Sequence, residues 1–137
     1  MSTEALMFSR LGRYALRTVA IITNFKTKIT GKELAERTGI PTSYQSKVLR
    51  RLVEAEILIA QKGHHGGFTL AQEPTAIRLA DVLRAVDAMP KEGKCVFEWG
   101  LCSSLEPCPL HTKWSSLSTQ VMNWAEDSTL NDLCFQS

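Results

Sequence analysis

The sequence of 137 residues lacks a long apolar segment. Its N-terminal apolar residues are interrupted by Arg10, Arg13 and Arg17, and no run approaches the roughly 20 residues that a membrane-spanning helix requires. The same stretch shows no signal peptide. We therefore expect a cytoplasmic protein that has no membrane partner.

Internal repeats, low-complexity tracts, a C-x-x-C pair and a nucleotide-binding glycine loop are also missing. No motif of a substrate pocket is present, so we expect neither an enzyme nor a small-molecule substrate. The chain is 44% hydrophobic and 22% charged, which is the composition of an ordinary globular domain. At this length it can bury a core of its own.

Cysteine is scarce, with four residues, yet three of them lie together in "KCVFEWGLCSSLEPCPLH", residues 94–111. In a cytoplasmic chain thiols stay reduced, so this cluster favours metal binding or redox chemistry over a disulfide scaffold. The cysteines fall in residues 88–109, which contain several Pro and Gly and show no sustained periodicity. A loop of this length is uncommon in a compact domain unless it is functional, so we expect that something orders it.

Two helix-start signals follow each other closely. "TGKE" at 30–33 and "TSYQ" at 42–45 both have the capping-box pattern, a hydroxyl cap followed three residues later by Glu or Gln. Gly39, between them, suits a left-handed helix end. The second helix is predicted from about Ser43 to Glu56. Two short helices joined by a tight Gly-containing turn are typical of a helix-turn-helix.

A β-hairpin is predicted directly after this motif. The β-prone stretches "ILIAQ" and "GFTLA" are joined by "KGHHGG", whose glycines permit a sharp turn, and a hairpin in this place is a wing. Helical spacing predicts a first helix over residues 5–25 and another over "IRLADVLRAVD". We expect a mainly α fold. It comprises a winged helix-turn-helix domain over residues 1–88, a loop over 89–109, and a long C-terminal helix with its tail over 110–137.

The last predicted helix, from about Leu110 to Glu126, carries a narrow apolar stripe. Its members are spaced by four, three, four and three residues, as in the a/d seam of a coiled coil: Leu110, Trp114, Leu117, Val121 and Trp124. Two tryptophans are costly to leave in water, so the stripe packs either on the protein core or on a second copy. We favour dimerisation, because symmetric DNA half-sites are normally read by a dimer.

Charge is distributed unevenly along the chain. Residues 1–88 carry thirteen Lys and Arg against eight Asp and Glu, whereas residues 89–137 carry three against six. The basic part holds the predicted helix-turn-helix, which points to double-stranded DNA as the partner. A Gln side chain can form two hydrogen bonds to the edge of adenine, and basic side chains can contact phosphates. The predicted DNA-contacting residues are Lys32, Thr42, Ser43, Tyr44, Gln45, Lys47, Arg50, Arg51, Lys62, His64 and His65.

Several of these side chains have a structural alternative. Tyr44 could belong partly to the core. Arg51 could pair with Glu54 or Glu56 on a solvated face. The two histidines could be loop residues with no ligand. The ordered series of helix, turn, helix and Gly-rich hairpin is more specific than any single residue in it.

The segments "RYALRTVAII", "GKELAERTGIPTSYQSKVLRRLVEAEIL" and "KGHHGGFTLA" resemble the bacterial winged-helix transcription regulators of the Rrf-two (Rrf2) family. The resemblance extends from about Leu11 to Trp124. It implies a homodimer that is crossed by the long C-terminal helix and binds a palindromic operator. In cluster-binding members three loop cysteines hold an iron–sulfur cluster, and IscR-like members add a histidine. The matching residues here are Cys95, Cys102, Cys108 and His111.

The sequence departs from the family pattern at three points. The first gap in C-x6-C-x5-C is one residue longer than in IscR-like members. Gln45, Ser46 and Lys47 stand where IscR-like helices carry Leu, Glu and Gln, so their operator preference should not be transferred. Arg13 stands where NsrR-like members have an acidic cluster ligand, which speaks against that mode of binding.

Three thiolates and an imidazole could hold either a zinc ion or an iron–sulfur cluster. Zinc sites usually place ligand pairs two to four residues apart, so gaps of six and five favour the cluster. A 2Fe–2S cluster with His111 as a ligand is preferred, and a 4Fe–4S cluster with another fourth ligand is possible. The operator affinity would respond to redox state, nitric oxide or iron–sulfur status. No role is predicted for Cys134.

Three other hypotheses remain open from the sequence. The loop cysteines could form a regulatory disulfide in a cluster-free thiol sensor that still binds DNA. The chain could be an iron–sulfur electron-transfer protein. It could also be a partner-binding protein whose DNA-reading unit is vestigial.

Overall fold

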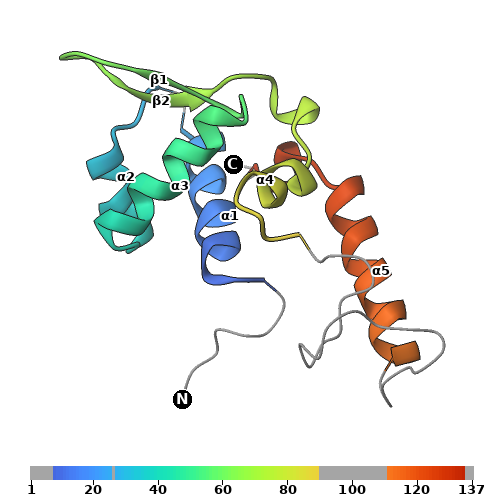
Figure 1. Ribbon diagram of the computed structural model, residues 1–137. Helices are drawn as coiled ribbons and strands as arrows, with labels where there is room; N and C mark the ends of the chain where they lie inside the picture. Colours follow the sequence, from blue (N-terminus) through green and yellow to red (C-terminus); the bar gives the residue numbers. More distant parts are fainter. Residues whose placement is uncertain (1–7, 26, 90–110, 135–137) are drawn as a thin grey trace.

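The computed structural model describes residues 8–25, 27–89 and 111–134 (Figure 1). These residues are mainly helical with one antiparallel hairpin, which confirms the predicted winged-helix class. The helices are α1 (Arg10–Thr23), α2 (Gly31–Thr38), α3 (Thr42–Glu54), α4 (Leu79–Ala85) and α5 (His111–Asp127). The strands are β1 (Leu58–Gln61) and β2 (Gly67–Leu70), and the 3-10 turns are η1 (Pro74–Ala76) and η2 (Leu130–Leu133). No helix in these ranges is both long and apolar enough to cross a membrane.

Local capping sets the ends of α1 and α2. The Ser9 hydroxyl accepts a hydrogen bond from the Gly12 amide at 3.2 Å, so α1 begins at Arg10, later than predicted. The Thr30 hydroxyl accepts from the Glu33 amide at 3.1 Å. Gly39 ends α2 with φ of 74°, a left-handed conformation that glycine adopts without strain. The predicted Thr30 cap and the glycine helix end are therefore confirmed, whereas the Glu33 carboxylate accepts from the Thr30 hydroxyl and not from its amide, so the reciprocal half of the first capping box is not formed.

The start of α3 differs from the prediction. The helix begins at Thr42 after Pro41, and no side chain caps it. The second predicted capping box, "TSYQ", is therefore wrong. Its Gln45 side chain turns into the protein interior and forms its hydrogen bonds there instead of at the helix start.

The wing is a two-stranded antiparallel sheet in which Leu58 pairs with Leu70 and Ala60 with Phe68. A bridge between Ile29 and Phe68 attaches the segment before α2 to the outer side of β2. Gly67 has φ of +148°, and a Cβ there would lie 2.9 Å from the Ile29 carbonyl oxygen. Glycine therefore permits the close approach that joins the hairpin to the helical body.

The core is built from α1, α2, α3 and α4, and the C-terminal segment completes it. The most deeply buried large side chains include Val19, Leu34, Leu52, Leu83 and Leu130. The Leu79 amide donates to the Ser128 carbonyl at 2.9 Å, and the Leu130 amide donates to the Ile77 carbonyl at 2.9 Å. These bonds hold the residue after α5 against the start of α4 and hold η2 against the end of η1. The His111 end of α5 lies at the periphery (Figure 1).

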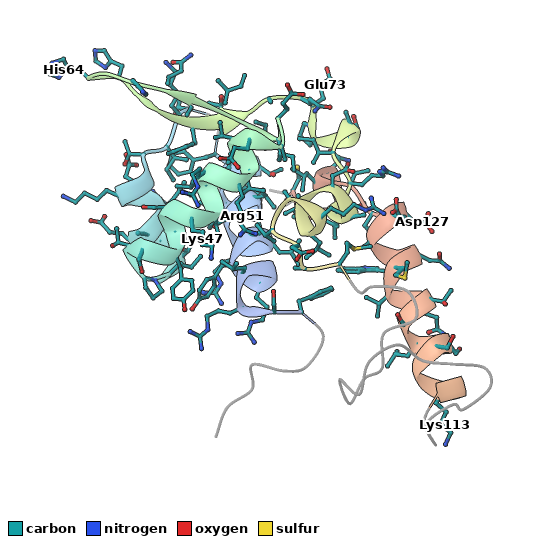
Figure 2. All side chains as sticks on the ribbon, viewed as in Figure 1. Lys47, Arg51, His64, Glu73, Lys113 and Asp127 are labelled. Atoms are coloured by element: carbon teal, nitrogen blue, oxygen red, sulfur yellow. The ribbon has the colours of Figure 1, made fainter. Side chains whose placement is uncertain are left out.

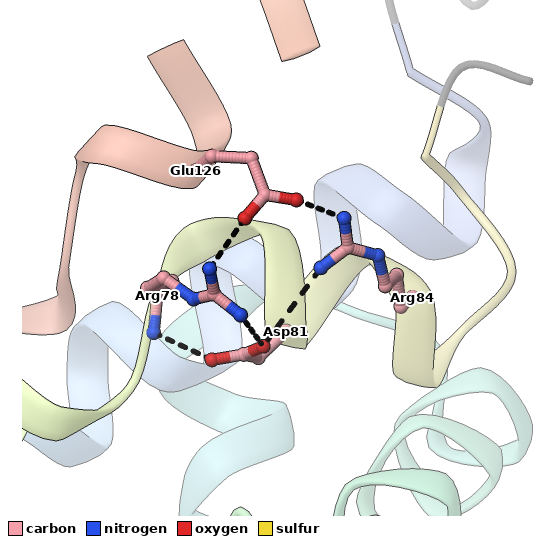
Figure 3. Close-up of polar contacts among 4 residues, drawn as sticks. All are labelled: Arg78, Asp81, Arg84 and Glu126. Carbon is pink, nitrogen blue, oxygen red and sulfur yellow. Dashed lines mark hydrogen bonds and ion pairs between the residues drawn. The ribbon is translucent and has the colours of Figure 1, made fainter. Parts of the chain in front are cut away.

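Four charged residues form an ion-pair cluster that fastens α5 to α4 (Figure 3). Glu126 on α5 accepts from both Arg78, at 2.6 Å, and Arg84. Asp81 pairs with Arg78 at 3.3 Å and lies 4.0 Å from Arg84. The hydrogen bond that Arg78 donates to Asp81, together with the negative charge of Asp81, raises the pKa of the Arg78 guanidinium. The cluster therefore connects α5 to α4 through four partly exposed charged side chains.

Candidate nucleic-acid interface

The exposed face of α3 is polar and basic. Thr42, Ser43, Ser46 and Arg50 are exposed, and they lie within about 100° of one another around the helix because successive residues turn by roughly 100°. Lys47, on the same side, is half-exposed. Small hydroxyls near the start of the helix and cations farther along can contact base edges and phosphates respectively. The structure therefore brings together most of the residues predicted on this helix.

Arg51 lies at the edge of this face and is half-exposed. In the part of the chain that the structure describes, neither Glu54 nor Glu56 forms an ion pair with it. The alternative role of Arg51, an ion pair with one of these carboxylates, is thus not supported in the described residues. Figure 2 shows Lys47 and Arg51 on α3. A DNA contact of Arg51 remains a prediction.

Gln45 does not belong to the exposed face, and its prediction as a base-reading residue is wrong. Its side chain is 2% exposed. The amide nitrogen donates to the Thr18 hydroxyl at 3.0 Å, and the amide oxygen accepts from the Thr38 hydroxyl at 3.0 Å. Gln45 falls on the α3 face that also buries Val48 and Leu52, which turns its amide away from solvent.

Tyr44 is half-buried between α3 and α1, as its structural alternative suggested. Its hydroxyl accepts from the Arg10 guanidinium at 3.2 Å, and the same guanidinium lies 5.5 Å from the centre of its ring. The Tyr14 ring meets Tyr44 edge-on at 5.6 Å. Arg10 thus places a cation beside the start of α3, a feature that sequence reasoning missed because the two residues are far apart in the chain.

The other predicted contacts lie on α2 and on the wing. Lys32 is exposed in the first turn of α2. Lys62, His64 and His65 are exposed in the turn of the hairpin, and Figure 2 shows His64 at its far tip. Sequence reasoning also missed Lys28, whose ammonium donates to the His65 carbonyl at 3.4 Å. It adds a cation at the base of this turn.

Of the four predicted cluster ligands, the structure describes the backbone of one. Cys95, Cys102 and Cys108 lie outside the described residues. His111 is the first residue of α5. Among residues 8–25, 27–89 and 111–134, no group of three or more His, Cys, Asp and Glu could hold a metal ion. Cys134 is an exposed free thiol.

Comparison with known proteins identifies the family. The model of the Rrf2 family, described as an iron-dependent transcriptional regulator, matches residues 8–136. The chain belongs to the Rrf2 family. The predicted resemblance is thereby confirmed. Rrf2 proteins are transcriptional regulators and not enzymes, which agrees with the helix-turn-helix and wing described above.

Individual relatives agree with this assignment to Rrf2. A protein of Aquifex aeolicus ascribed to the HTH-type transcriptional regulators is 30% identical over 131 residues, which cover 93% of this chain and 91% of that protein. The regulator IscR of Vibrio vulnificus is 28% identical over 124 residues, 89% of this chain and 73% of IscR. The structure of CymR, the global cysteine regulator of B. subtilis, matches with a TM-score of 0.76 at 22% identity and covers 93% of this chain and 95% of CymR.

Proposed function

We propose that this Rrf2 protein is a homodimer that binds a palindromic operator and whose affinity is switched by an iron–sulfur cluster. The observation that carries the DNA-binding part is the exposed polar and basic face of α3 beside a basic wing. Ser43 and Ser46 would read base edges in the major groove. Arg50 and Lys62 would neutralise phosphates and set the register of the protein on the duplex.

The donor set fits an iron–sulfur cluster. Cys95, Cys102, Cys108 and His111 supply three thiolates and one imidazole, a combination found on 2Fe–2S and 4Fe–4S centres. When bound, such a cluster supplies redox and nitric-oxide reactivity. Support comes from the description of the Rrf2 family as iron-dependent and from relatives named IscR.

Helix α5 offers a physical route from these ligands to the DNA-reading unit. His111 begins the helix, and Glu126 near its other end is paired to Arg78 and Arg84 beside α4. A ligand set that includes His111 would therefore bias how α5 is placed on the winged domain. In a dimer this placement would set the separation of the two α3 helices, and so the operator affinity.

The dimer interface is assigned to the apolar stripe of α5. Leu117 is 44% exposed and Trp124 is 47% exposed, although both are large and apolar. Val121 is half-buried between them, and Phe8 stacks on Trp124 with ring centres 6.1 Å apart. Solvent-exposed apolar residues in a row on one helix mark a protein contact surface more often than a free surface. A second copy of α5 would cover this stripe.

Leu117→Asp tests the dimer and the palindrome together. A buried unpaired carboxylate costs several kcal/mol, so the variant is expected to weaken dimerisation by about 100-fold or more in analytical ultracentrifugation. Wild-type protein should select a two-fold symmetric duplex from a random-sequence pool, and the monomeric variant should bind that duplex poorly. Thr119→Asp, on the opposite side of α5, is the control and should leave both properties unchanged. A wild-type monomer, or a selected sequence without symmetry, would contradict the assignment.

A further inference from the structure

A buried polar network joins α3 to α1 and α2. Gln45 is 2% exposed, Thr18 is 0% exposed and Thr38 is 8% exposed. The Gln45 amide nitrogen donates to the Thr18 hydroxyl at 3.0 Å, and its oxygen accepts from the Thr38 hydroxyl at 3.0 Å. One side chain in the first turn of α3 therefore contacts both neighbouring helices through directional bonds.

The network is anchored at both of its ends. The Thr38 hydroxyl shares its single proton between the Gln45 oxygen and the Leu34 carbonyl, which lies 2.6 Å away, and it accepts from the Ile40 amide at 3.2 Å. The Arg17 guanidinium donates to the Thr38 carbonyl at 3.0 Å. Thr18 belongs to the middle of α1 and has no solvent exposure. Gln45 is thus held between two groups that have little freedom to move.

The other buried residues of α3 constrain it in a different way. Val48, Leu49 and Leu52 pack by apolar contact, which favours close approach but has little directional preference. Pro41 provides no side-chain cap to the start of α3. The N-terminal end of α3 is the end that would read DNA. Inside the protein, the hydrogen bonds of Gln45 are therefore what constrains the rotation of α3 at this end. Tyr44 supplies a second, surface contact there through Arg10.

Small rotations of α3 would matter for base reading. Side-chain tips lie about 5–6 Å from a helix axis, so a rotation of roughly 20° moves a tip by about 2 Å. Hydrogen bonds to bases need donor–acceptor distances of about 2.7–3.2 Å. A displacement of that size breaks base contacts of Ser43 or Ser46, whereas long flexible cations still reach phosphates.

We propose that Gln45 is a positioning residue that sets the rotation of α3 and thereby the sequence discrimination of the protein. The proposal rests on the proposed function, because it needs α3 to read DNA. Removing Gln45 alone leaves the buried Thr18 hydroxyl without this partner, which costs about 1–3 kcal/mol, so a moderate loss of stability is expected beside the loss of discrimination. Because binding to an unrelated duplex also requires folded protein, unchanged affinity for that duplex separates a loss of discrimination from a loss of stability.

Gln45→Met tests this role, because Met has a similar length and forms no such bonds. Binding would be measured to two duplexes at one salt concentration: the duplex that wild-type protein selects from a random pool and an unrelated duplex of equal length. We expect the preference for the selected duplex to fall about tenfold or more, with binding to the unrelated duplex unchanged. The unfolding temperature should fall by about 4–12 °C, the shift that corresponds to roughly 1–3 kcal/mol, and both titrations are made below it.

A second set of variants tests the bond itself. Thr18→Val keeps the shape of the side chain and removes the acceptor, so it should lose discrimination as Gln45→Met does, whereas Thr18→Ser should retain it. Thr23→Val is the matched control, because among the residues that the structure describes the Thr23 hydroxyl donates only to the Val19 carbonyl of its own helix, at 2.6 Å. Its duplex preference should equal that of the wild type.

The outcomes separate this inference from the proposed function. An unchanged preference in folded Gln45→Met or Thr18→Val would overturn the role of Gln45, and so would unfolding of both variants at the assay temperature. A wild-type protein that prefers no duplex over any other would instead contradict the proposed function.

Discussion

Replacing Arg50 and Lys62 together by alanine is expected to weaken binding to the selected duplex by about 100-fold near physiological salt. Each cation that neutralises a phosphate releases counterions, so the slope of log affinity against log salt should fall by about 2, roughly 0.9 for each lost contact. Arg50 is exposed on the reading face of α3, and Lys62 is exposed at the wing. Fluorescence anisotropy at several salt concentrations measures both quantities.

The matched control for this pair is Lys113→Glu. It changes the net charge by the same two units, but Lys113 lies on the outer part of α5, away from α3 and the wing (Figure 2). Its affinity and salt slope should stay near the wild-type values. Equal losses in the control and in the double variant would show that net charge, and not the proposed interface, governs binding. An unaffected double variant would favour a vestigial DNA-reading unit.

Replacing Cys102 by alanine is expected to remove nearly all iron and acid-labile sulfide from protein purified without oxygen. Cluster ligation depends on thiolates, and Cys102 is the central cysteine of the proposed ligand set. The visible absorption of the wild-type protein should disappear with the metal. Iron analysis, sulfide analysis and the absorption spectrum check this result.

Cys134→Ala is the control for the cysteine variant. Cys134 is an exposed free thiol in the C-terminal tail, outside the proposed ligand set, so its loss should leave the iron and sulfide contents unchanged. Zinc without sulfide in the wild type would identify a zinc site. Wild-type protein without metal, but with an oxidation-dependent disulfide among the loop cysteines, would favour the thiol sensor. Unaltered iron in Cys102→Ala would remove Cys102 from the ligand set.

The fold could largely be predicted from the sequence because local signals determine it. Thr30 and Glu33 mark the start of α2, and Gly39 marks its end, through bonds between residues close in the chain. The glycines of "KGHHGG" similarly predict the turn between β1 and β2. Signals of this kind need no knowledge of distant partners.

The candidate interface could be predicted only in part, because burial depends on distant residues. Its polarity and its place at the start of a helix predict Gln45 as a DNA contact. Yet it precedes Val48, Leu49 and Leu52 by three, four and seven residues, the spacing of one buried face. That periodicity could have revealed its burial. Its partner Thr18 lies 27 residues away, and no local pattern identifies it.

The proposed coupling between cluster and operator is tested by measuring operator affinity as a function of cluster content. One anaerobic preparation would be titrated with the selected duplex before and after its iron is removed by a chelator, with folding checked by circular dichroism. If the cluster switches DNA binding, the affinities of the two states differ by at least about tenfold, since each 1.4 kcal/mol of coupling gives a factor of ten. Equal affinity with and without iron, in protein that remains folded, would contradict the proposed coupling.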